Sequence, residues 1–266
     1  MRNVTSRQVL THQKFHAATQ NTAKNCPNYS KSVSFVAQCD DRRIDLNMTT
    51  TNSPLASWHP KLAAIAAAIS GDDGAHDTNH LHRVWRNATL LLPDHPEADA
   101  LVVLAACYLH DIVNLPKNHP ERHLASRQAA REATRVLAGA QFPPELLPAV
   151  AHAIETHSFS AALVPATIEA KIVQDADRLD ALGAVGLARM FYTAGRMGSG
   201  LAHGTDPAGL DRALDDKAYS LDHIAVKLAT LPGTMQTAAA RRLGEERLRA
   251  LTAFRDQFVA EWSAPA

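Results

Sequence analysis

Metal-competent side chains gather in one part of this sequence: nine of the fourteen histidines lie between His76 and His157, interleaved with acidic residues. Among them, His110 and Asp111 follow an apolar run over residues 101–109. Burying an imidazole and a carboxylate without a partner is costly, so this pair needs a shared counter-charge. Adjacent residues of a helix point about 100° apart, which lets both side chains approach one cation from neighbouring directions. The pair is therefore a candidate metal-binding element.

A His-Asp doublet alone is weak evidence for a metal site, because residues 76–77 form a second doublet in the same chain. The stronger observation is a set of residues that comes from three predicted helices. His80 lies on the first helix, His110 and Asp111 end the second, and the third contains the acidic segment 174–180. Three separate helices can thus each supply a ligand.

The acidic segment offers two candidates, Asp175 and Asp177. Two positions on a continuous helix correspond to about 200° of rotation, so only one of these carboxylates can face the cation that the other ligands define. Mixed nitrogen and oxygen ligands with open coordination positions suit Mn²⁺, Fe²⁺, Co²⁺ or Mg²⁺ better than a closed structural zinc site.

The order of these residues resembles the HD-domain superfamily of metal-dependent phosphohydrolases, whose motif is a His, a His-Asp doublet and a distant Asp along an all-α fold. His80 with the Arg-Val pair at 83–84 is similar to the first element, the doublet 110–111 to the second, and Asp177 within Ala-Asp-Arg-Leu to the last. Further likeness to a subgroup of small bacterial HD hydrolases lies in segments 109–117, 174–184 and 214–219. The resemblance covers about residues 58–262.

This resemblance implies an irregular HD-domain bundle of about 7–9 helices and a divalent metal ion, with manganese among the candidates. It also implies that the final ligand is Asp177 and not Asp175. His157, in a His-Ser-Phe-Ser turn, is similar to a family histidine that would donate a proton to the leaving group or bind phosphate. The alternative for His157 is a surface histidine favoured by the dipole of a helix C-terminus. The implied metal ligands are His80, His110, Asp111 and Asp177.

The expected activity is hydrolysis of a phosphoester or phosphoanhydride, in a nucleotide or a nucleotide-like small molecule. A metal ion lowers the pKa of its bound water, so metal-bound hydroxide would be the nucleophile. Asp111 or His157 would assist proton transfer, which makes these two the predicted catalytic residues. Substitution of His110 or Asp111 by Ala should remove both metal and activity.

Four further residues are predicted to bind substrate: His76, Arg83, Lys117 and Asp180. Residues 76 and 77 share a helical face with His80 and could orient a ligand, bind substrate or hold a second ion, or Asp77 could simply cap the helix. Arg83 could bind a phosphate in a bidentate manner or form a salt bridge with Asp111 or Asp77.

Asp180 lies three positions after Asp177, so it shares the face of that residue and could support the ligands or line the pocket. Lys117, with Arg122 and His123, belongs to a proline-bounded stretch that suits a pocket rim; the alternative is a cluster of solvated charges.

Helices must position these residues, and from Leu55 onward helical signals repeat with short breaks while no alternating pattern favours a sheet. Proline and glycine residues punctuate the pattern. The predicted catalytic core covers about 76–194, within a domain over 55–262 that ends in C-terminal helices over 211–262. The predicted helices are 61–70, 77–92, 97–113, 123–138, 144–157, 166–194, 211–230 and 234–262.

The bulk composition excludes several classes of protein. The 27 basic residues balance the 27 acidic ones, so no global basic field favours nucleic acid or an anionic membrane. Three widely spaced cysteines without a C-x-x-C pair argue against a disulfide framework. No apolar run reaches the length of a bilayer span. A soluble protein of the cytoplasm is expected, with no nucleic acid or membrane partner and with an oligomeric state that the sequence leaves open.

Residues 1–50 differ from the rest of the chain, because polar residues are frequent and no acidic residue precedes Asp40. This segment is predicted to be disordered. It could be an organelle transit peptide or an extension upstream of a start at Met48.

Three other functions compete with phosphohydrolysis. His76 and His80 have the i and i+4 spacing of zinc peptidases, but Asp77 stands where those enzymes need Glu, so a peptidase is disfavoured. A di-iron oxygenase on the same fold would bind two irons, and a nucleotide-sensing module would bind a ligand without hydrolysing it. Metal stoichiometry and phosphate release discriminate among them.

Overall fold

The computed structural model describes residues 53–69, 77–113, 115, 119–158 and 161–263. Within these ranges it contains nine α-helices, five short 3₁₀ helices and no β-strand, so the predicted all-α class is confirmed. The prediction for residues 1–50 lies outside the described residues. The α-helices are α2 (Pro54–Ile69), α3 (Thr78–Leu91), α4 (Ala100–Leu109), α5 (Ala125–Gly139), α6 (Leu147–His157), α7 (Ile168–Asp180), α8 (Gly183–Arg196), α9 (Asp222–Val226) and α10 (Ala238–Trp262).

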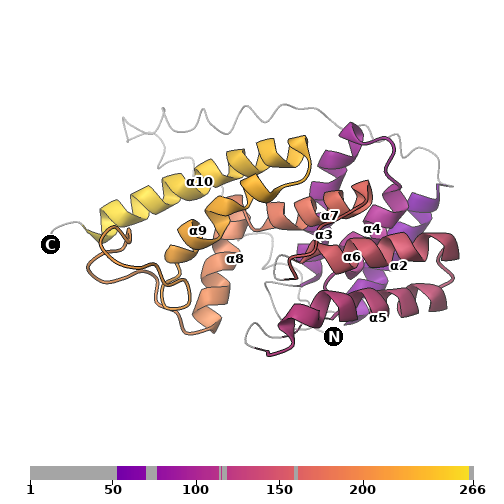
Figure 1. Cartoon of the computed structure of the whole chain (residues 1–266), viewed down its shortest axis with the longest axis horizontal. Helices are drawn as coiled ribbons and strands as arrows, with labels where there is room; N and C mark the ends of the chain where they lie inside the picture. The colour runs from indigo at the N-terminus through magenta and orange to yellow at the C-terminus, as the bar shows by residue number, and fades with distance from the viewer. Residues whose placement is uncertain (1–52, 70–76, 114, 116–118, 159–160, 264–266) are drawn as a thin grey trace, which may run out of the picture. The chain divides into compact units, whose positions relative to one another are not determined.

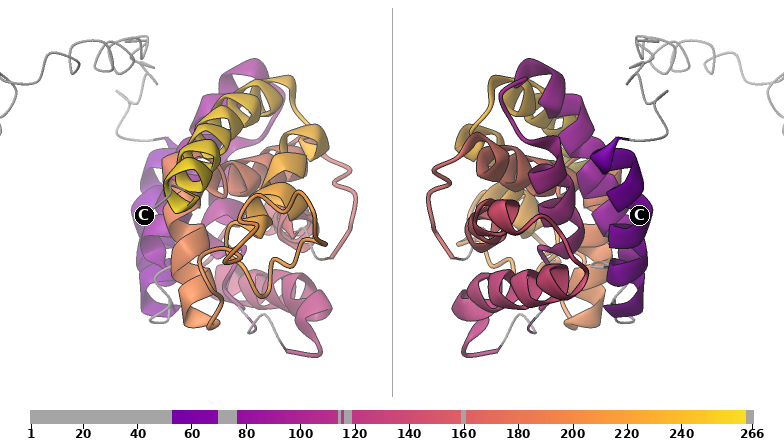
Figure 2. Two further views of the ribbon diagram at one scale, coloured as in Figure 1. Left: turned by 90° about the vertical axis from the view of Figure 1, so that its left-hand side faces the viewer. Right: turned by 90° about the vertical axis from the view of Figure 1, so that its right-hand side faces the viewer.

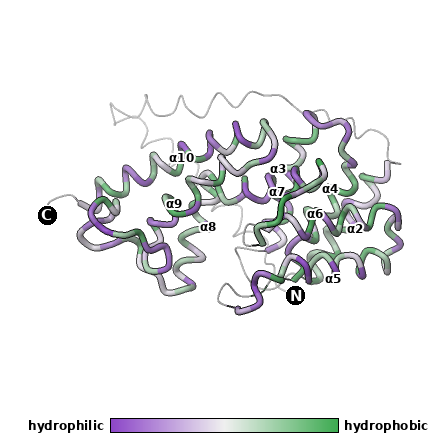
Figure 3. The backbone as a smooth tube through the Cα atoms, in the orientation of Figure 1, coloured by the Kyte–Doolittle hydropathy of each residue, from purple (hydrophilic) through white to green (hydrophobic). Residues whose placement is uncertain are grey.

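Helix α4 forms the centre of the core. Every residue from Leu101 to Leu109 is buried, as expected for a helix that is apolar on all sides. Helices α2, α3, α6 and α7 pack against α4, and α5 covers α6 (Figure 1). The tube in Figure 3 is coloured as hydrophobic along α4. Because α4 is enclosed, the polar residues at its C-terminal end are brought into the interior.

Helices α3, α4 and α7 each begin with a side-chain cap. Asp77 caps α3 by accepting a hydrogen bond from the His80 amide at 2.9 Å, and Asp99 caps α4 through the Leu101 amide at 2.8 Å. Thr167 caps α7 through the Ala170 amide at 3.2 Å. These bonds satisfy amides that have no partner inside a helix, so they fix where each helix begins.

The long helix α10 is fastened to the core by polar contacts. It packs on α8 and α7, as the views in Figure 2 show for the yellow helix. Arg247 of α10 donates hydrogen bonds to Leu179 O at 2.7 Å and to Asn87 Oδ1 at 2.8 Å, and Asn87 in turn donates to Ala176 O at 2.9 Å. Helices α3, α7 and α10 are therefore held in one fixed arrangement.

Three predicted helices were wrong in extent. The helix predicted over 61–70 begins earlier, since α2 covers Pro54–Ile69. The single helix predicted over 166–194 is divided into α7 and α8, because the chain is extended at Leu182 (ψ 164°) and Gly183 takes a φ of +73°. That backbone conformation suits glycine, which has no Cβ to clash.

The helix predicted over 211–230 is reduced to α9 and a 3₁₀ turn. Arg212 forms a bidentate ion pair with buried Asp222, at 2.6 and 2.7 Å, and Asp222 also accepts a hydrogen bond from the Asp215 amide. Asp206 accepts hydrogen bonds from the amides of Leu210 and Asp211. Side chains that bond the backbone in this way compete with helix formation.

None of the described helices combines the length and the apolar composition that a membrane crossing requires.

Candidate metal centre

His80 occupies the first turn of α3, where it is 1% exposed. Its Nδ1 lies 2.8 Å from Asp180 Oδ2. An ionised carboxylate only accepts hydrogen bonds, so Nδ1–H donates and the neutral ring carries its lone pair on Nε2. That Nε2 atom points toward the ends of α4 and α7.

His110 is the C-cap residue of α4, and Asp111 comes next. His110 is 1% exposed, and its Nδ1–H donates to Cys107 O at 3.0 Å, which again leaves the lone pair of the neutral ring on Nε2. Asp111 follows in the turn after the helix, with 21% of its side chain exposed. The C-terminal end of a helix carries a partial negative charge, so it adds to the attraction for a cation.

Asp175 and Asp177 point to opposite sides of α7, as expected from their helical spacing. Asp175 is fully buried and accepts three hydrogen bonds, from the amides of Gln236 and Thr237 and from the Thr237 hydroxyl, at 2.7–2.8 Å. Asp177 Oδ1 instead lies 3.4 Å from His80 Nε2 and 3.8 Å from His110 Nε2. The geometry places Asp177 with the histidines and Asp175 at the start of α10.

The four predicted ligands come together around one point. His80 Nε2 lies 3.3 Å from His110 Nε2 and 3.7 Å from Asp111 Oδ2, and His110 Nε2 lies 3.6 Å from the same carboxylate oxygen. With the Asp177 contacts, these distances suit atoms that share one ion. Three of the residues, His80, His110 and Asp111, offer ligand atoms that all lie within 4.8 Å of one another, as do His110, His157 and Asp177.

The electrostatics of the cluster favour a cation. Burial lowers the pKa of His80 below its ordinary value, with Arg189 and His110 adding to the effect against the opposing influence of Asp180 and Asp177. Burial raises the pKa of Asp177, but the neighbouring histidines outweigh it and the net pKa is lowered. A neutral imidazole at His80 and an ionised carboxylate at Asp177 are therefore the favoured states near neutral pH. Two imidazole lone pairs 3.3 Å apart repel each other, and a bound cation would turn that repulsion into coordination.

Asp180 lies behind His80 and not at the centre of the cluster. It is 3% exposed, and it bonds Arg83 at 2.8 and 3.1 Å and Arg189 at 2.8 Å as well as His80. Although burial raises it, hydrogen bonds from His80 and Arg83 bring the pKa of Asp180 to about 2. This carboxylate thus fixes the ring orientation of His80, which is how carboxylates behind metal-bound histidines act.

Arg83 forms its ion pair with Asp180, whereas Asp111 or Asp77 was predicted as its salt-bridge partner. Asp77 is close to Arg83 in sequence, and Asp111 belongs to the motif. Asp180 is distant in sequence and reaches Arg83 because α7 packs against α3. Asp77 caps α3, so the simpler of its two predicted roles is present. His76 and Lys117 lie outside the described residues.

His157, the last residue of α6, is 6% exposed and is not a surface histidine. Its Nδ1–H donates to Ile154 O at 2.6 Å, and its Nε2 lies 3.8 Å from Asp111 Oδ1. Burial, with His110, lowers its pKa against the opposing influence of Asp111 and Asp177. His157 therefore presents a lone pair to the cluster beside Asp111 and His110.

A cavity opens beside the cluster. It is lined by His110, Asp111, Val113, Arg122, Ala125, Ser126, His157 and Ser158. Ser126 and Lys227 were not predicted as site residues from the sequence. Nothing in the pattern distinguishes a serine at the start of α5 or a lysine after α9, because both reach this region only through packing of distant segments.

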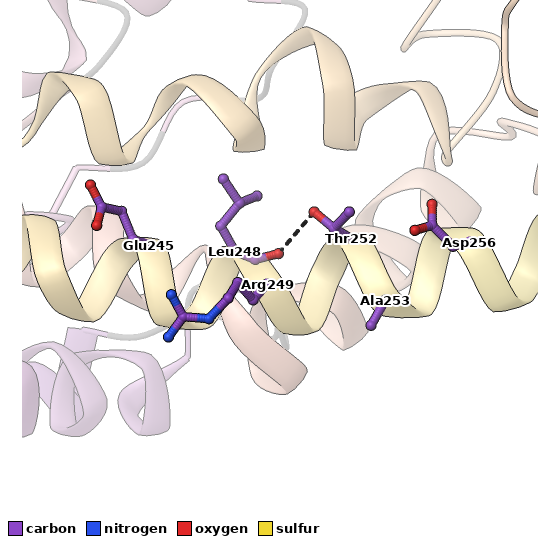
Figure 4. A pocket seen from close by; sticks show the side chains of 6 residues that line it. All are labelled: Glu245, Leu248, Arg249, Thr252, Ala253 and Asp256. Carbon is purple, nitrogen blue, oxygen red and sulfur yellow. Dashed lines mark hydrogen bonds between the residues drawn. The ribbon is translucent and has the colours of Figure 1, made fainter.

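A second hollow runs along α10 and is lined by one helix alone (Figure 4). Its polar residues include Glu245, Arg249 and Asp256, and Thr252 bonds Leu248 O within the helix. It contains no histidine and no residue of the metal cluster, so it is not the candidate site.

The donor set fits a divalent metal ion. Two imidazole nitrogens and two carboxylates give a site near zero net charge when one divalent ion is bound, and mixed nitrogen and oxygen donors suit Mn²⁺, Fe²⁺ or Co²⁺. The buried ring positions are fixed by hydrogen bonds to Asp180 and to the carbonyls of Cys107 and Ile154.

Comparison with known proteins agrees with this geometry. The HD domain family model matches residues 78–182. Among curated proteins, the uncharacterized protein YpgQ of Bacillus subtilis is 32% identical over 187 residues, which covers 69% of this chain and 82% of YpgQ.

Solved structures extend the likeness to three dimensions. The crystal structure of Bacillus subtilis YpgQ in complex with ADP matches with a TM-score of 0.60 and 30% identity, covering 77% of this chain and 95% of YpgQ. An HD-superfamily hydrolase from Bacillus thuringiensis matches with a TM-score of 0.59 and 30% identity over 79% of this chain and 98% of its own. The fold, the order of the motif and these relatives lead to one conclusion: the chain belongs to the HD-domain phosphohydrolase family.

Proposed function

We propose that this protein hydrolyses a phosphoester or phosphoanhydride bond in a nucleotide-like small molecule, with a divalent metal ion as cofactor. Membership of the HD-domain family indicates a metal-dependent hydrolase, and the proposal adds the class of substrate. The observation that carries the proposal is the convergence of His80, His110, Asp111 and Asp177 at 3.3–3.8 Å, with Nδ1 of both rings bonded to oxygen. The ADP bound to YpgQ supports a nucleotide as the class of substrate.

The proposed ligands are His80, His110, Asp111 and Asp177. A divalent ion held there would lower the pKa of a bound water and stabilise negative charge on phosphoryl oxygens. Asp180 and Arg83 would act as positioning residues, because their hydrogen bonds hold the ring of His80. For Asp180 this is one of its two predicted roles, support of the ligands, whereas for Arg83 it differs from the predicted binding of a phosphate.

His157 and Asp111 would handle protons. Nε2 of neutral His157 lies 3.8 Å from Asp111 Oδ1, with its lone pair toward the centre of the cluster. It could take a proton from an attacking water and return it to the leaving oxygen. Asp111 would hold the water in line as well as bind the ion.

The test is a panel of nucleoside mono-, di- and triphosphates, assayed for released phosphate and pyrophosphate with Mn²⁺, Co²⁺, Mg²⁺ and Zn²⁺. Metal-dependent release is expected, and His110→Ala and Asp111→Ala should abolish it together with metal binding. Full activity in either variant would refute the site. Absence of any release by wild-type protein that still binds ADP would favour a nucleotide sensor.

A di-iron oxygenase is the second candidate, because His157 Nε2 offers a further nitrogen donor beside the four proposed ligands. Elemental analysis and an oxygen electrode separate the two functions. Two irons per chain with consumption of O₂ would replace the proposed hydrolysis, whereas one ion with released phosphate would support it.

A further inference from the structure

The cavity beside the metal cluster has an unusual residue in its wall. Ser126 is 3% exposed, and among the described residues its hydroxyl Oγ has no hydrogen-bond partner. Nearly all buried polar atoms are bonded, so a buried hydroxyl that lacks a partner in the protein calls for an explanation. Its place in the wall of a cavity makes a ligand the simplest partner.

Ser126 lies in the first turn of α5. The residue before this 15-residue helix, Leu124, makes no side-chain cap hydrogen bond. A helix N-terminus carries a partial positive charge and attracts anions. The dipole of α5 and the Ser126 hydroxyl thus favour the same kind of ligand.

Two cationic side chains belong to this region. Arg122 lines the same cavity as Ser126 and precedes α5. Lys227 follows α9, and its ammonium interacts electrostatically with Asp177 of the metal cluster and with Arg122.

The surroundings of Lys227 are partly unfavourable for a cation. Burial is the main cause that lowers its pKa, and the positive charges of Arg122 and Arg189 lower it further, against the attraction of Asp177 and Asp216. Cations that lie close enough to repel each other gain from an anion placed between them.

We propose that Ser126, Arg122 and Lys227 form a phosphate-binding subsite next to the metal centre. Its ligand is a phosphate group of the substrate other than the one that is attacked, which makes a nucleoside diphosphate or triphosphate the preferred class. The proposal rests on the proposed function, since it assumes that the attacked phosphate lies at the metal. The subsite lies on the His110, Asp111 and His157 side of the cluster, because these three residues line the cavity.

Binding of ADP to metal-free protein tests the subsite without turnover. Isothermal titration calorimetry in EDTA would compare wild type, Ser126→Ala and Lys227→Gln, with adenosine as the ligand that lacks phosphate. We expect Ser126→Ala to weaken ADP binding by about 5-fold, as for one neutral hydrogen bond. Lys227→Gln should weaken it by about 10-fold or more, as for a charged donor. Adenosine should bind all three proteins equally.

Each variant has a matched control. Thr134→Val removes a hydroxyl from the same helix, where Thr134 bonds Ala130 O away from the cavity lining. Lys61→Gln removes one lysine charge on α2, where Lys61 lies over the Trp58 ring. Both controls should bind ADP like wild type. In addition, Ser126→Ala should not lower the urea midpoint of the ligand-free protein, because it removes a hydroxyl without a partner.

The outcomes separate the subsite from the proposed function. ADP binding that is unmeasurable in wild type, or equal in wild type and both variants, overturns the subsite. Weakened ADP binding in the variants, in a protein that hydrolyses nothing on the nucleotide panel, supports the subsite and removes the proposed function. In active protein, Lys227→Gln should raise KM for a diphosphate substrate more than it lowers kcat.

Discussion

Asp175 and Asp177 lie two positions apart on α7, and their carboxylates meet opposite surroundings. On the side that faces the start of α10, Asp175 accepts hydrogen bonds from two amides and a hydroxyl. On the other side, Asp177 meets imidazole nitrogens at 3.4 and 3.8 Å whose rings have already given their Nδ1–H to other oxygens.

The difference separates a structural polar cluster around Asp175 from the proposed metal site around Asp177. Around Asp175 donors and acceptors match, so the cluster is stable by itself and holds two helices together. Around Asp177 the groups that converge are mainly lone pairs and negative charge, which gain from a cation. The composition of a polar cluster, and not its burial, is therefore the guide to function in this protein.

The largest expected effect comes from exchanging each carboxylate for an amide. Asp177→Asn should lose the bound metal and the hydrolytic activity, since it removes a ligand charge from the centre. Asp175→Asn should keep the metal stoichiometry of wild type. Elemental analysis of the purified variants makes the comparison, with circular dichroism as the folding control. If Asp175→Asn loses the metal and Asp177→Asn keeps it, Asp175 is the ligand and Asp177 is not.

A decrease in pH should affect the histidines near Asp177 and the cluster around Asp175 differently. The pKa values of His80 and His157 are lowered in the folded protein, mainly by burial, from an ordinary value of 6.5. The unfolded chain therefore binds more protons below that pH, and the free energy of unfolding falls as the pH decreases through about 6. Burial raises the pKa of Asp175, so protonation of this residue does not reduce the free energy of unfolding as the pH decreases.

Urea unfolding of metal-free protein at pH 7.5 and 5.5 measures this effect. Wild type should have a lower midpoint at pH 5.5, and His157→Gln should show a smaller difference between the two pH values. Equal midpoints for wild type would contradict the burial of neutral histidines. With metal present, occupancy should decline over the same range, because protons compete for the ligand nitrogens.

A smaller effect on metal binding is expected from Asp180, which lies behind His80. Asp180→Asn should weaken metal binding by about 10–100-fold, as is usual for a carboxylate that orients a metal-bound histidine. The reason is that Asp180 fixes the ring of His80 and itself bonds Arg83 and Arg189. Competition with a fluorescent chelator gives the affinity. An unchanged affinity together with a raised KM would return Asp180 to the substrate-binding role that the sequence suggested.

The smallest expected effect concerns stability alone. Asp175→Asn replaces one acceptor oxygen by an NH2 group that faces hydrogen-bond donors, and loss of a buried acceptor costs about 1–3 kcal/mol. Its thermal midpoint should fall, while Asp256→Asn on the exposed part of α10 should leave the midpoint unchanged. A thermal midpoint like that of wild type would show that the α10 contact is not a stabilising one.

Much of this arrangement could be predicted from local pattern. The apolar run 101–109 forms the buried helix α4, and His110 and Asp111 lie at its end as expected. The helical separation of Asp175 and Asp177 also appears in the structure. The division of 166–194 at Gly183 could not be predicted, because the helical pattern does not mark the left-handed backbone conformation of that glycine. The reduced helix over 211–230 could not be predicted either, because it depends on the contact between Arg212 and Asp222.

The sequence by itself determined the all-α class, the order of the histidine and aspartate elements, and the family to which they belong. These features are local, since helical periodicity and short motifs are properties of neighbouring residues. Only the tertiary structure decided which partner each charge meets. Asp180 supports His80, Arg83 pairs with Asp180, and Lys227 comes near Asp177 because helices from distant parts of the chain pack together. Electrostatic interactions act through space, and the distances that set them exist only in the folded protein.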